Sequence, residues 1–422
     1  MLIKQFGRSK FQMKNKKTII YIGGFELPDK NAAAQRVLAN AKILRELNYN
    51  VLLIGIDKEL QNDSDIKKTK RTIEGFESFS MPYPNSKKLW FTHIISAHVM
   101  KMLLLEMDDV YAVICYNYPA IAMYNILQLC KKKNIMCLAD ATEWYENSGG
   151  GVLFNSIKWL DTFLRMYYVH SKVDGIISVS TFLTEFYTKK HQSVIQLPTL
   201  YDVKDFKYSK KSENKDKKTH FLYAGSAFTI ERVTKDRSNI KDRLDVIIST
   251  FVKVHKSNTE FILNIYGLTK ENYLLVFPEY KEILFKLDKH ILFHGRCPHQ
   301  EIIKSIQESD FTIFIRRLDR VIEAGFPSKY SESISYGTPV ISNMISNIEP
   351  YSEEGKNHFE LDLNDENNRV KKILKILELE EDTIDDMKFY CKNHKIFDYR
   401  IYIKEMETFF QDIKNQGNYE IY

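Results

Sequence analysis

Short apolar runs alternate with amphipathic segments along most of this chain. The apolar runs read KTIIYIGG, NVLLIGI, VYAVICY, NIMCLAD, DGIISVS and SVIQLP. Between the first two runs, apolar residues recur at helical spacing, at Val37, Leu38, Ala41, Leu44 and Leu47. Continuous apolar strands that are joined by helical crossovers are typical of a parallel sheet covered on both faces. The pattern therefore predicts an α/β fold.

The alternation stops once and then resumes, which predicts two domains. Residues 201–218, YDVKDFKYSKKSENKDKK, are charged and lack periodicity, so we expect a linker there. We expect one doubly wound parallel-sheet domain over 1–200, a second over 219–397, and an amphipathic helix within 398–422. Two such domains would face one another across a cleft, and ligands of such sheets bind beyond the carboxyl ends of the strands.

Composition narrows the classes of partner. The net charge of +6 at pH 7 favours anionic ligands or a membrane surface over nucleic acid. No apolar segment is long enough to span a membrane, and the basic start, residues 1–17, lacks the apolar core of a secretory signal. Five cysteines without a CxxC spacing indicate a reducing compartment and argue against a zinc site. We therefore expect a cytoplasmic protein without a bound metal.

The segment Ala324–Ile341, AGFPSKYSESISYGTPVI, predicts a short helix, a glycine stop and a buried strand. Pro327 suits the first turn of that helix, whose free backbone N–H groups can bind an anion. Glu332 lies about one turn inside the helix and could accept two hydrogen bonds from the diol of a ribose. Phosphate on the amides and ribose on the carboxylate together describe a nucleotide. The alternative is that Glu332 only complements the helix dipole.

The stretch FPSKYSESISYGTPVIS resembles the C-terminal signature of family 4 glycosyltransferases, which belong to group 1 and have the GT-B fold of two Rossmann-like domains. That signature has a glutamate, seven further residues and a second glutamate. Glu332 matches the second glutamate, whereas Ala324 stands where the first would contact the donor sugar. Glu323 or Asp319 could compensate for the missing carboxylate.

The resemblance assigns the donor to the second domain. It implies that Pro327, Ser328 and Lys329 lie at the nucleotide, with the Lys329 cation beside the diphosphate. The stretch FLYAGSAF resembles the strand and glycine turn that face the donor phosphates, with the glycine at Gly225. Lys241 takes the place of the family's diphosphate lysine, Asp242 stands where that lysine is followed by glycine, and Arg243 is a second candidate cation. In ILFHGRCPHQEI, the backbone from Gly295 and Arg296 to Cys297 would contact the base.

The resemblance assigns the acceptor to the first domain. IGGFELPDKNAAAQRV looks like the family's glycine loop and first helix, where Gly23 and Gly24 allow close approach of a ligand. Asn31 suits the N-cap of that helix, and Arg36 could reach an anionic acceptor or the diphosphate. A solvated arginine and an ordinary glycine turn are the alternatives. The resemblance also implies that the helix within 398–422 packs back on the first domain.

The loop of NIMCLADATEWYENSGG would carry the chemistry. Many relatives have a histidine here, and Thr142 takes its place in this chain. Glu143 and Asp140 remain as catalytic candidates, with Glu143 as general base or as a ligand of a sugar hydroxyl. Alternatively, Asp140 only caps a turn. The segment 154–172 is expected to be a core helix, with an interfacial helix facing a lipid-linked acceptor as the alternative.

The resemblance implies a retaining glycosyltransferase that moves a sugar from a nucleotide-diphosphate donor to a glycan or lipid-linked acceptor, in bacterial surface polysaccharide assembly. It needs no cofactor, and no metal either, because no Asp-x-Asp motif stands where transferases of the other common fold need one. A cytoplasmic location, peripheral on the inner face of the membrane, is expected. The alternatives are a non-catalytic nucleotide-binding or scaffold partner and a nucleotide-sugar 2-epimerase. The sugar, base, acceptor and oligomeric state do not follow from the sequence.

Overall fold

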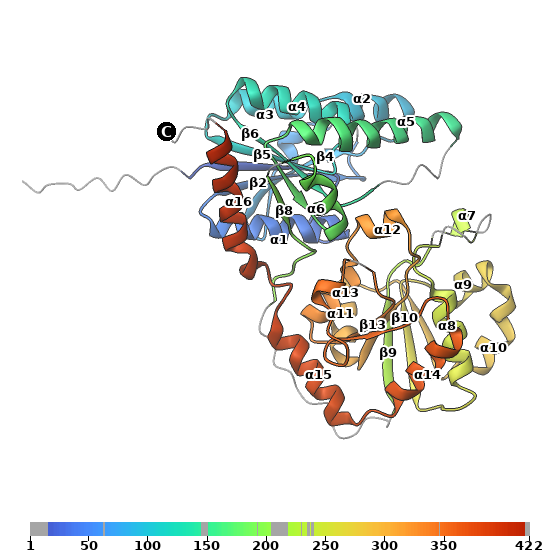
Figure 1. Ribbon diagram of the computed structural model, residues 1–422. Coiled ribbons are helices and arrows are strands. Elements are labelled where there is room, and N and C mark those ends of the chain that lie inside the picture. The colour runs from blue at the N-terminus through green and yellow to red at the C-terminus, as the bar shows by residue number, and fades with distance from the viewer. Residues whose placement is uncertain are drawn as a thin grey trace, which may run out of the picture.

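The computed structural model describes residues 16–417, apart from 62–63, 145–150, 192, 204–217, 229, 234–236, 238–239 and 346. Within these residues the chain forms two domains, each built on its own sheet (Figure 1). The expected linker, 201–218, and the expected loop after Trp144 lie largely outside the described residues. No helix in the described part of the chain has the length and apolar character needed to cross a membrane.

The N-terminal sheet has eight strands in the order β3-β4-β2-β1-β5-β6-β7-β8. All neighbouring pairs are parallel except β3 with β4. The strands are β1 (Thr18–Gly23), β2 (Asn50–Asp57), β3 (Arg71–Ile73), β4 (Phe76–Pro82), β5 (Val110–Tyr116), β6 (Met136–Ala141), β7 (Gly175–Ser178) and β8 (Val194–Gln196). The helices are α1 (Ala32–Glu46), α2 (Lys87–Ile95), α3 (His98–Glu106), α4 (Ala120–Lys132), α5 (Val152–Leu164) and α6 (Thr181–Thr188). Helices cover both faces of this sheet (Figure 1).

The C-terminal sheet has six parallel strands in the order β11-β10-β9-β12-β13-β14. The strands are β9 (Thr219–Ala224), β10 (Phe261–Tyr266), β11 (Ile291–Gly295), β12 (Phe311–Phe314), β13 (Val340–Ser342) and β14 (His358–Glu360). The helices are α7 (Ile230–Val233), α8 (Leu244–Val254), α9 (Lys270–Val276), α10 (Lys281–Lys286), α11 (His299–Glu308), α12 (Arg320–Ala324), α13 (Ser328–Ser335), α14 (Glu366–Leu377) and α15 (Glu381–His394). The two parallel sheets confirm the predicted α/β class.

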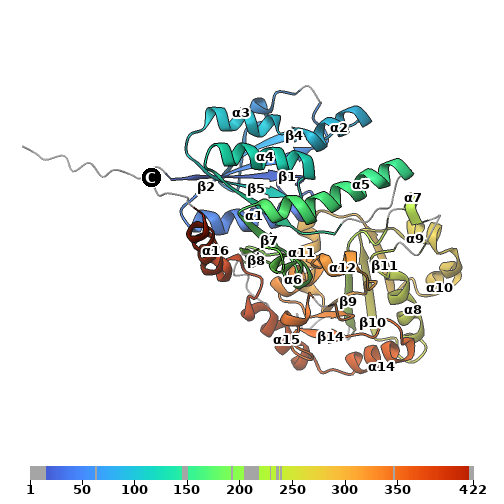
Figure 2. The ribbon, with the colours of Figure 1, turned by 45° about the horizontal axis from the view of Figure 1, so that its top comes forward.

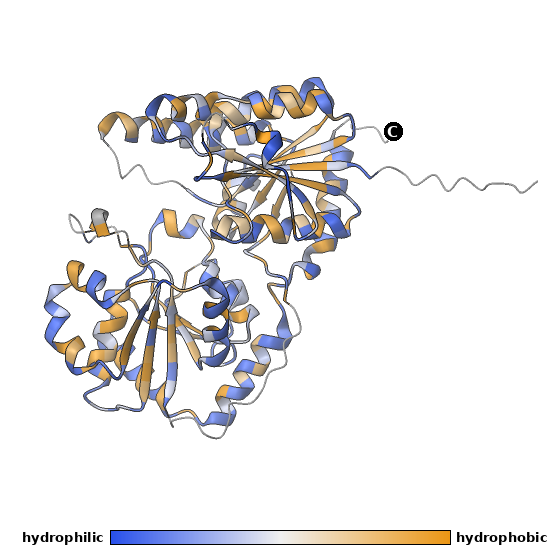
Figure 3. Ribbon diagram, turned by 180° about the vertical axis from the view of Figure 1, so that it is seen from behind, coloured by the Kyte–Doolittle hydropathy of each residue, from blue (hydrophilic) through white to orange (hydrophobic). Residues whose placement is uncertain are grey.

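The strands are apolar because each sheet is buried on both faces. All six residues of β1 and all six of β6 are buried. Figure 3 shows hydrophobic residues along the strands of both sheets, with hydrophilic residues gathered on the outward sides of the helices. The apolar runs of the sequence therefore correspond to the central strands.

The last helix, α16 (Ile403–Gln416), returns to the N-terminal domain. Figures 1 and 2 both show it against the first sheet, far in sequence from the strands that it covers. Its buried face consists of Met406, Phe409, Phe410 and Ile413. At Gly175 a Cβ atom would lie 2.5 Å from Ile413 Cδ1, so β7 requires glycine where α16 crosses it. The N-terminal core is therefore completed by the end of the chain.

The segment 154–172 is only in part the core helix that the sequence favoured: its last turns bury Met166 and Val169, whereas α5 is largely exposed. In α5, among the described residues, only Thr162 is buried, and the Trp159 residue is 52% exposed. Its apolar residues extend around most of the helix, and only one side can pack, with Phe154 against Trp90 at 5.3 Å between ring centroids. The remaining apolar side faces outward, which favours the interfacial alternative.

We predict that α16 is needed for the stability of the N-terminal domain. Phe410 packs against the stacked pair of Tyr49 and Tyr111, with ring centroids at 5.7 and 6.2 Å. Phe410→Ala should lower the unfolding free energy of this domain by about 3–5 kcal/mol, because it leaves a cavity. All three tryptophans lie in this domain, so urea unfolding followed by tryptophan fluorescence reports on it. Phe389→Ala is the control because Phe389 is 62% exposed; equal effects of the two changes would contradict the docking of α16.

Candidate functional site

A cavity of about 240 Å³ lies between the two domains. It opens where β6 ends in the first domain and where α13 begins in the second, as expected for ligand sites of doubly wound sheets. The domains meet beside it: Ser180 Oγ donates to Ala324 O at 2.8 Å, and the Arg320 guanidinium lies 4.5 Å from the Trp144 ring. The cavity is lined by Ala32, Arg36, Tyr116, Thr142, Glu143, Trp144, Val179, Thr199, Lys241, Arg316, Val321, Gly325, Phe326 and Ser328.

Arg36 and Asp140 form a buried ion pair behind the first-domain wall. Asp140 is 0% exposed and accepts hydrogen bonds from Arg36 Nη2 at 2.8 Å and from the Tyr21 hydroxyl. Arg36 Nη1 donates to Leu197 O at 2.7 Å and also contacts Pro198 O. The pair therefore joins α1, β6 and the segment that leaves the first domain. Asp140 lies beneath the cavity rather than on its surface, so we interpret it as a positioning residue, whereas Arg36 also lines the cavity.

Glu143 has a different setting from Asp140. It is exposed, and it is the one carboxylate among the described residues that line the cavity. Thr142, in the place of the family's histidine, is buried, and its Oγ1 accepts a hydrogen bond from Asn117 Nδ2 at 2.5 Å. Of the two predicted catalytic candidates, only Glu143 can therefore meet a ligand directly.

The predicted glycines of the first domain serve two purposes. A Cβ at Gly23 would lie 2.6 Å from Tyr116 Cβ, so this glycine is required for the packing of β1 against β5. A Cβ at Gly24 would meet nothing within 4 Å, so that position is open. Asn31 is the N-cap of α1, where its Oδ1 accepts from Ala34 N at 2.9 Å. Only Gly24 of these three offers free space for a ligand.

On the other side of the cavity, cations gather around the carboxylate of Asp242. It accepts hydrogen bonds from Lys329 Nζ at 2.7 Å, Arg316 Nε at 3.1 Å and the Tyr223 hydroxyl at 3.0 Å. Burial raises the pKa of Asp242, but Lys329 and Arg316 outweigh it and hold that pKa well below the usual value. The carboxylate is therefore charged, and it fixes the two cations in place.

The geometry also explains Gly225, whose φ of +144° is in a region that side chains rarely adopt. A Cβ at Gly225 would lie 2.6 Å from Lys329 Cε, so only glycine at this position leaves room for the Lys329 side chain. The Gly225 turn and Lys329 are therefore packed together, although 104 residues separate them in the sequence. Nothing in the local sequence around either residue indicates this contact.

Three cations face a single buried carboxylate at this wall. Lys241 lines the cavity, and Arg316 beside it, together with burial, lowers the pKa of its ammonium group. In the described part of the chain, the terminal NH₂ groups of Arg316 have no hydrogen-bond acceptor, whereas those of Arg36 are paired. Three positive charges against one negative charge leave a surplus of two, which suits an anionic ligand. Arg243 instead pairs with Asp245 at 2.7 Å.

Glu332 lies on α13, which begins at Ser328 after Pro327 at the N-cap and is followed by Gly337 with φ of +80°. Its Oε1 is 2.7 Å from His299 Nε2, at the start of α11. His299 follows the turn that Gly295, with φ of +69°, opens after β11, and Arg296 in this turn is exposed. The structure therefore brings Glu332 next to the turn that the sequence assigned to the base.

Ala324 is buried, and neither expected substitute simply fills its place. Asp319 caps α12 by accepting hydrogen bonds from Val321 N and Ile322 N, and its other oxygen pairs with Arg317. The backbone carbonyl of Glu323 accepts a hydrogen bond from Asn347 Nδ2. The sequence also left the role of Arg316 open and gave none to His299. The one indication of the cation cluster in the sequence was Asp242, which stands in the place of the family's glycine.

Comparison with known proteins agrees with this geometry. Residues 207–393 match the family model described as glycosyl transferases group 1. Sucrose-phosphate synthase from Thermosynechococcus elongatus has a TM-score of 0.65 at 11% identity, over 95% of this chain and 100% of its own. A glycosyltransferase from Rickettsia africae gives 0.65 at 14% identity, over 96% and 100% of the two chains.

A third solved structure, HepE from Anabaena in complex with UDP, gives a TM-score of 0.61 at 10% identity, over 94% of this chain and 100% of its own. A sequence search among curated proteins gave no match. The likeness to solved structures extends over both domains and confirms the predicted GT-B fold.

We predict that the pKa of His299 depends on Glu332. The hydrogen bond that the Glu332 carboxylate accepts from His299, together with the carboxylate's charge, raises the pKa of His299 above its usual value, despite partial burial. The pair should therefore stabilise the fold fully below the ordinary histidine pKa of about 6.5, and this contribution should be lost as pH rises through the raised pKa. An NMR titration of the imidazole should give a pKa above 6.5, and Glu332→Gln should lower it.

His255 is the internal control for this titration, because burial rather than a carboxylate shifts its pKa, and it shifts it downward. Its pKa should be the same in both proteins. An unchanged pKa of His299 in the Glu332→Gln variant would contradict the pairing.

Proposed function

We propose that this chain, which is a group 1 glycosyltransferase with the GT-B fold, transfers a sugar from a nucleoside-diphosphate donor to a glycan or lipid-linked acceptor. We assign it to family 4, with retention at the anomeric carbon, and to bacterial surface polysaccharide assembly. The observation that carries the proposal is the surplus of positive charge around Asp242, from which Lys241 and Arg316 reach the interdomain cavity that Glu143 also lines.

The donor would lie mainly on the second domain. Its diphosphate would meet Lys241, Arg316 and Lys329, together with the free N–H groups at the start of α13. The hydroxyl groups of the ribose diol would donate hydrogen bonds to the Glu332 carboxylate and replace His299 there. Solved relatives support this choice of ligand class, since HepE from Anabaena was crystallised with UDP, and the pneumococcal O-GlcNAc transferase GtfA with UDP and GlcNAc.

The chemistry follows from where charge develops. As the bond between the anomeric carbon and the phosphate oxygen breaks, negative charge accumulates on the leaving diphosphate. Lys241, Arg316 and Lys329 neutralise it from fixed positions, so the reaction needs no metal and no cofactor. The acceptor hydroxyl attacks the same face of the sugar, and Glu143 orients it and takes its proton.

The two alternatives fare differently. A 2-epimerase would need several acids and histidines around the sugar, whereas the described lining residues of the cavity include one carboxylate, Glu143, and no histidine. A non-catalytic nucleotide-binding or scaffold partner would keep the cations and lack transfer, and the buried Ala324 motivates it. Product analysis separates it from the transferase.

The proposal is tested by calorimetric titration with UDP, GDP, ADP and CDP. We expect one nucleotide to bind selectively, and Glu332→Ala to weaken it about 10- to 100-fold, because charge-assisted hydrogen bonds contribute about 1.5–3 kcal/mol. Glu308→Ala, an exposed glutamate on the nearby α11 whose contact is a 3.8 Å pair with Lys304, should have no effect.

The same preparation separates donor binding from transfer. Glu143→Gln should leave the nucleotide affinity unchanged and lower transfer from the matching nucleotide sugar about 10²- to 10⁴-fold, the usual contribution of a general base. No nucleotide binding in the wild type would contradict the donor site, and full transfer by Glu143→Gln would remove Glu143 from the mechanism.

We also propose that the first domain contacts the inner face of the cell membrane through α5. Trp159 and Phe163 on α5 and Tyr167 in the helical turn Arg165–Val169 that follows it stack in sequence, at 5.5 and 4.9 Å between ring centroids, and each is more than 40% exposed. Lysines accompany these rings: Lys190 Nζ lies 3.8 Å from the Tyr167 ring, and Lys172 Nζ lies 4.4 Å from that of Tyr168. Aromatic rings with basic neighbours suit the interface of an anionic membrane.

We therefore predict co-sedimentation of the protein with vesicles of phosphatidylglycerol and phosphatidylethanolamine. Trp159→Ser with Phe163→Ser should lower vesicle binding at least about tenfold, because each ring contributes on the order of 1 kcal/mol of apolar burial. Phe285→Ser is the control, since Phe285 is 78% exposed on α10 of the other domain. Equal binding of all three proteins would contradict this surface.

A further inference from the structure

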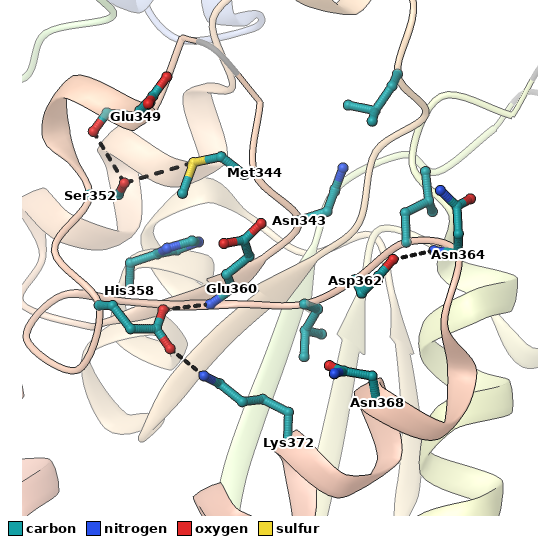
Figure 4. Close-up of a pocket in the computed structure, with 14 residues that line it drawn as sticks. Asn343, Met344, Glu349, Ser352, His358, Glu360, Asp362, Asn364, Asn368 and Lys372 are labelled. Atoms are coloured by element: carbon teal, nitrogen blue, oxygen red, sulfur yellow. Dashed lines mark hydrogen bonds and ion pairs between the residues drawn. The ribbon is translucent and has the colours of Figure 1, made fainter.

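A second cavity, of about 790 Å³, lies in the C-terminal domain at the carboxyl ends of β13 and β14 (Figure 4). Its size is within the range of small-molecule sites, roughly 300–1,000 Å³. It is separate from the interdomain cavity, since the two have no lining residue in common. The carboxyl ends of parallel strands are where ligands of doubly wound sheets bind.

The groups that surround this cavity match the hydrogen-bonding pattern of a polyol. Figure 4 shows Glu360, Asp362, Asn364 and Asn368 around one hollow, on the end of β14, the following loop and the start of α14. Asn364 and Asn368 are exposed, and in the described part of the chain their side-chain amides have no protein partner and are open to a ligand; their backbone N–H groups are the atoms that bind Asp362 and Asp365. Amides both donate and accept and carboxylates accept, as sugar hydroxyls require.

The net charge of the residues that line the second cavity limits which ligands it can bind. Glu349, Glu354, Glu360 and Asp362 carry four negative charges and Lys372 one positive charge, which gives −4 + 1 = −3. His358 adds none at pH 7, because burial lowers its pKa to about 4. A phosphorylated or sulfated ligand would be repelled. Among the described residues, no group of three His, Cys, Asp or Glu is placed to hold a metal ion, so a metal ion is not the natural occupant.

The second cavity is directly joined to the transfer site through one loop. Arg316, which lines the interdomain cavity, is held on both backbone sides by Asn343: its N–H donates to Asn343 Oδ1 at 2.8 Å, and its carbonyl accepts from Asn343 Nδ2 at 3.0 Å. Asn343 lines the second cavity. Leu318, two residues after Arg316, also lines the second cavity and is 52% exposed. Residues 316–318 therefore contribute to both cavities.

We propose that the second cavity is a subsite for further sugar units of an uncharged or amino-bearing glycan acceptor. This inference rests on the proposed transferase function and extends it from the reacting sugar to the chain that carries it. The subsite would give the enzyme a preference for elongated acceptors, because Asn364, Asn368 and the carboxylates of Glu360 and Asp362 contact units beyond the one that reacts.

The test uses the full chain, labelled with a fluorophore, on an array of neutral, amino-bearing and sulfated oligosaccharides. The wild type should bind neutral or amino-bearing glycans of several units. Asn364→Ala with Asn368→Ala should lower that binding at least tenfold. Asn367→Ala is the matched control, since Asn367 is exposed on the same helix and does not line the cavity.

Calorimetry with UDP, GDP, ADP and CDP on the same three proteins keeps the two proposals apart. Nucleotide affinity should be equal in all of them, because the changes lie outside the interdomain cavity. Loss of glycan binding in the double variant alone, with nucleotide affinity retained, would support the subsite. Binding of none of the glycans, binding of sulfated glycans only, or equal binding by the double variant would each overturn it, whatever the nucleotide result.

Discussion

The buried carboxylate of Asp242 is the interaction on which the second domain's site depends. It receives Tyr223 from β9, Arg316 from the end of β12 and Lys329 from α13, three segments that come together only in the folded sheet. A buried carboxylate that lost these partners would be costly, and cations without the carboxylate would repel one another. The Asp242 charge therefore allows positive charges to stand close together and still leaves a surplus for a ligand.

The first domain contains a comparable group that serves another purpose. There, Asp140 binds Arg36 and Tyr21, again with the tyrosine on the central strand of the sheet. Arg36 also donates hydrogen bonds to two backbone carbonyls, whereas the terminal groups of Arg316 have no acceptor in the described part of the chain. The same three residue types thus join elements of the fold in one domain and belong to a cluster with surplus positive charge in the other. The difference lies in whether the arginine finds further acceptors within the protein.

The fold could be predicted from the sequence because its signal is local. Apolar runs of strand length and the helix before Gly337 are features of neighbouring residues, and both domains follow from them. The pairing of Arg36 with Asp140 could not be predicted in this way, since 104 residues separate them and only the register of the sheet joins them. For a related reason the sequence left a core helix and an interfacial helix as alternatives for α5: an apolar helix has the same sequence pattern whether its second side meets protein or another surface. Glu332 was placed beside the turn after β11, but its contact with His299 depends on how α11 and α13 lie together.

The path of the chain between the domains has a mechanical consequence. Tyr201 leaves the first domain and Tyr399 returns to it, and the two strands of this crossing are joined by hydrogen bonds from Tyr201 N to Phe397 O at 2.8 Å and from Tyr399 N to Tyr201 O at 3.1 Å. Two parallel connections that are bonded to each other resist sliding and stretching, and they bend most easily about a single line. The domains are therefore expected to open and close by a hinge rotation about this crossing. Access to the interdomain cavity is then expected to depend on the hinge angle between the two domains, and a ligand would leave when that angle widens.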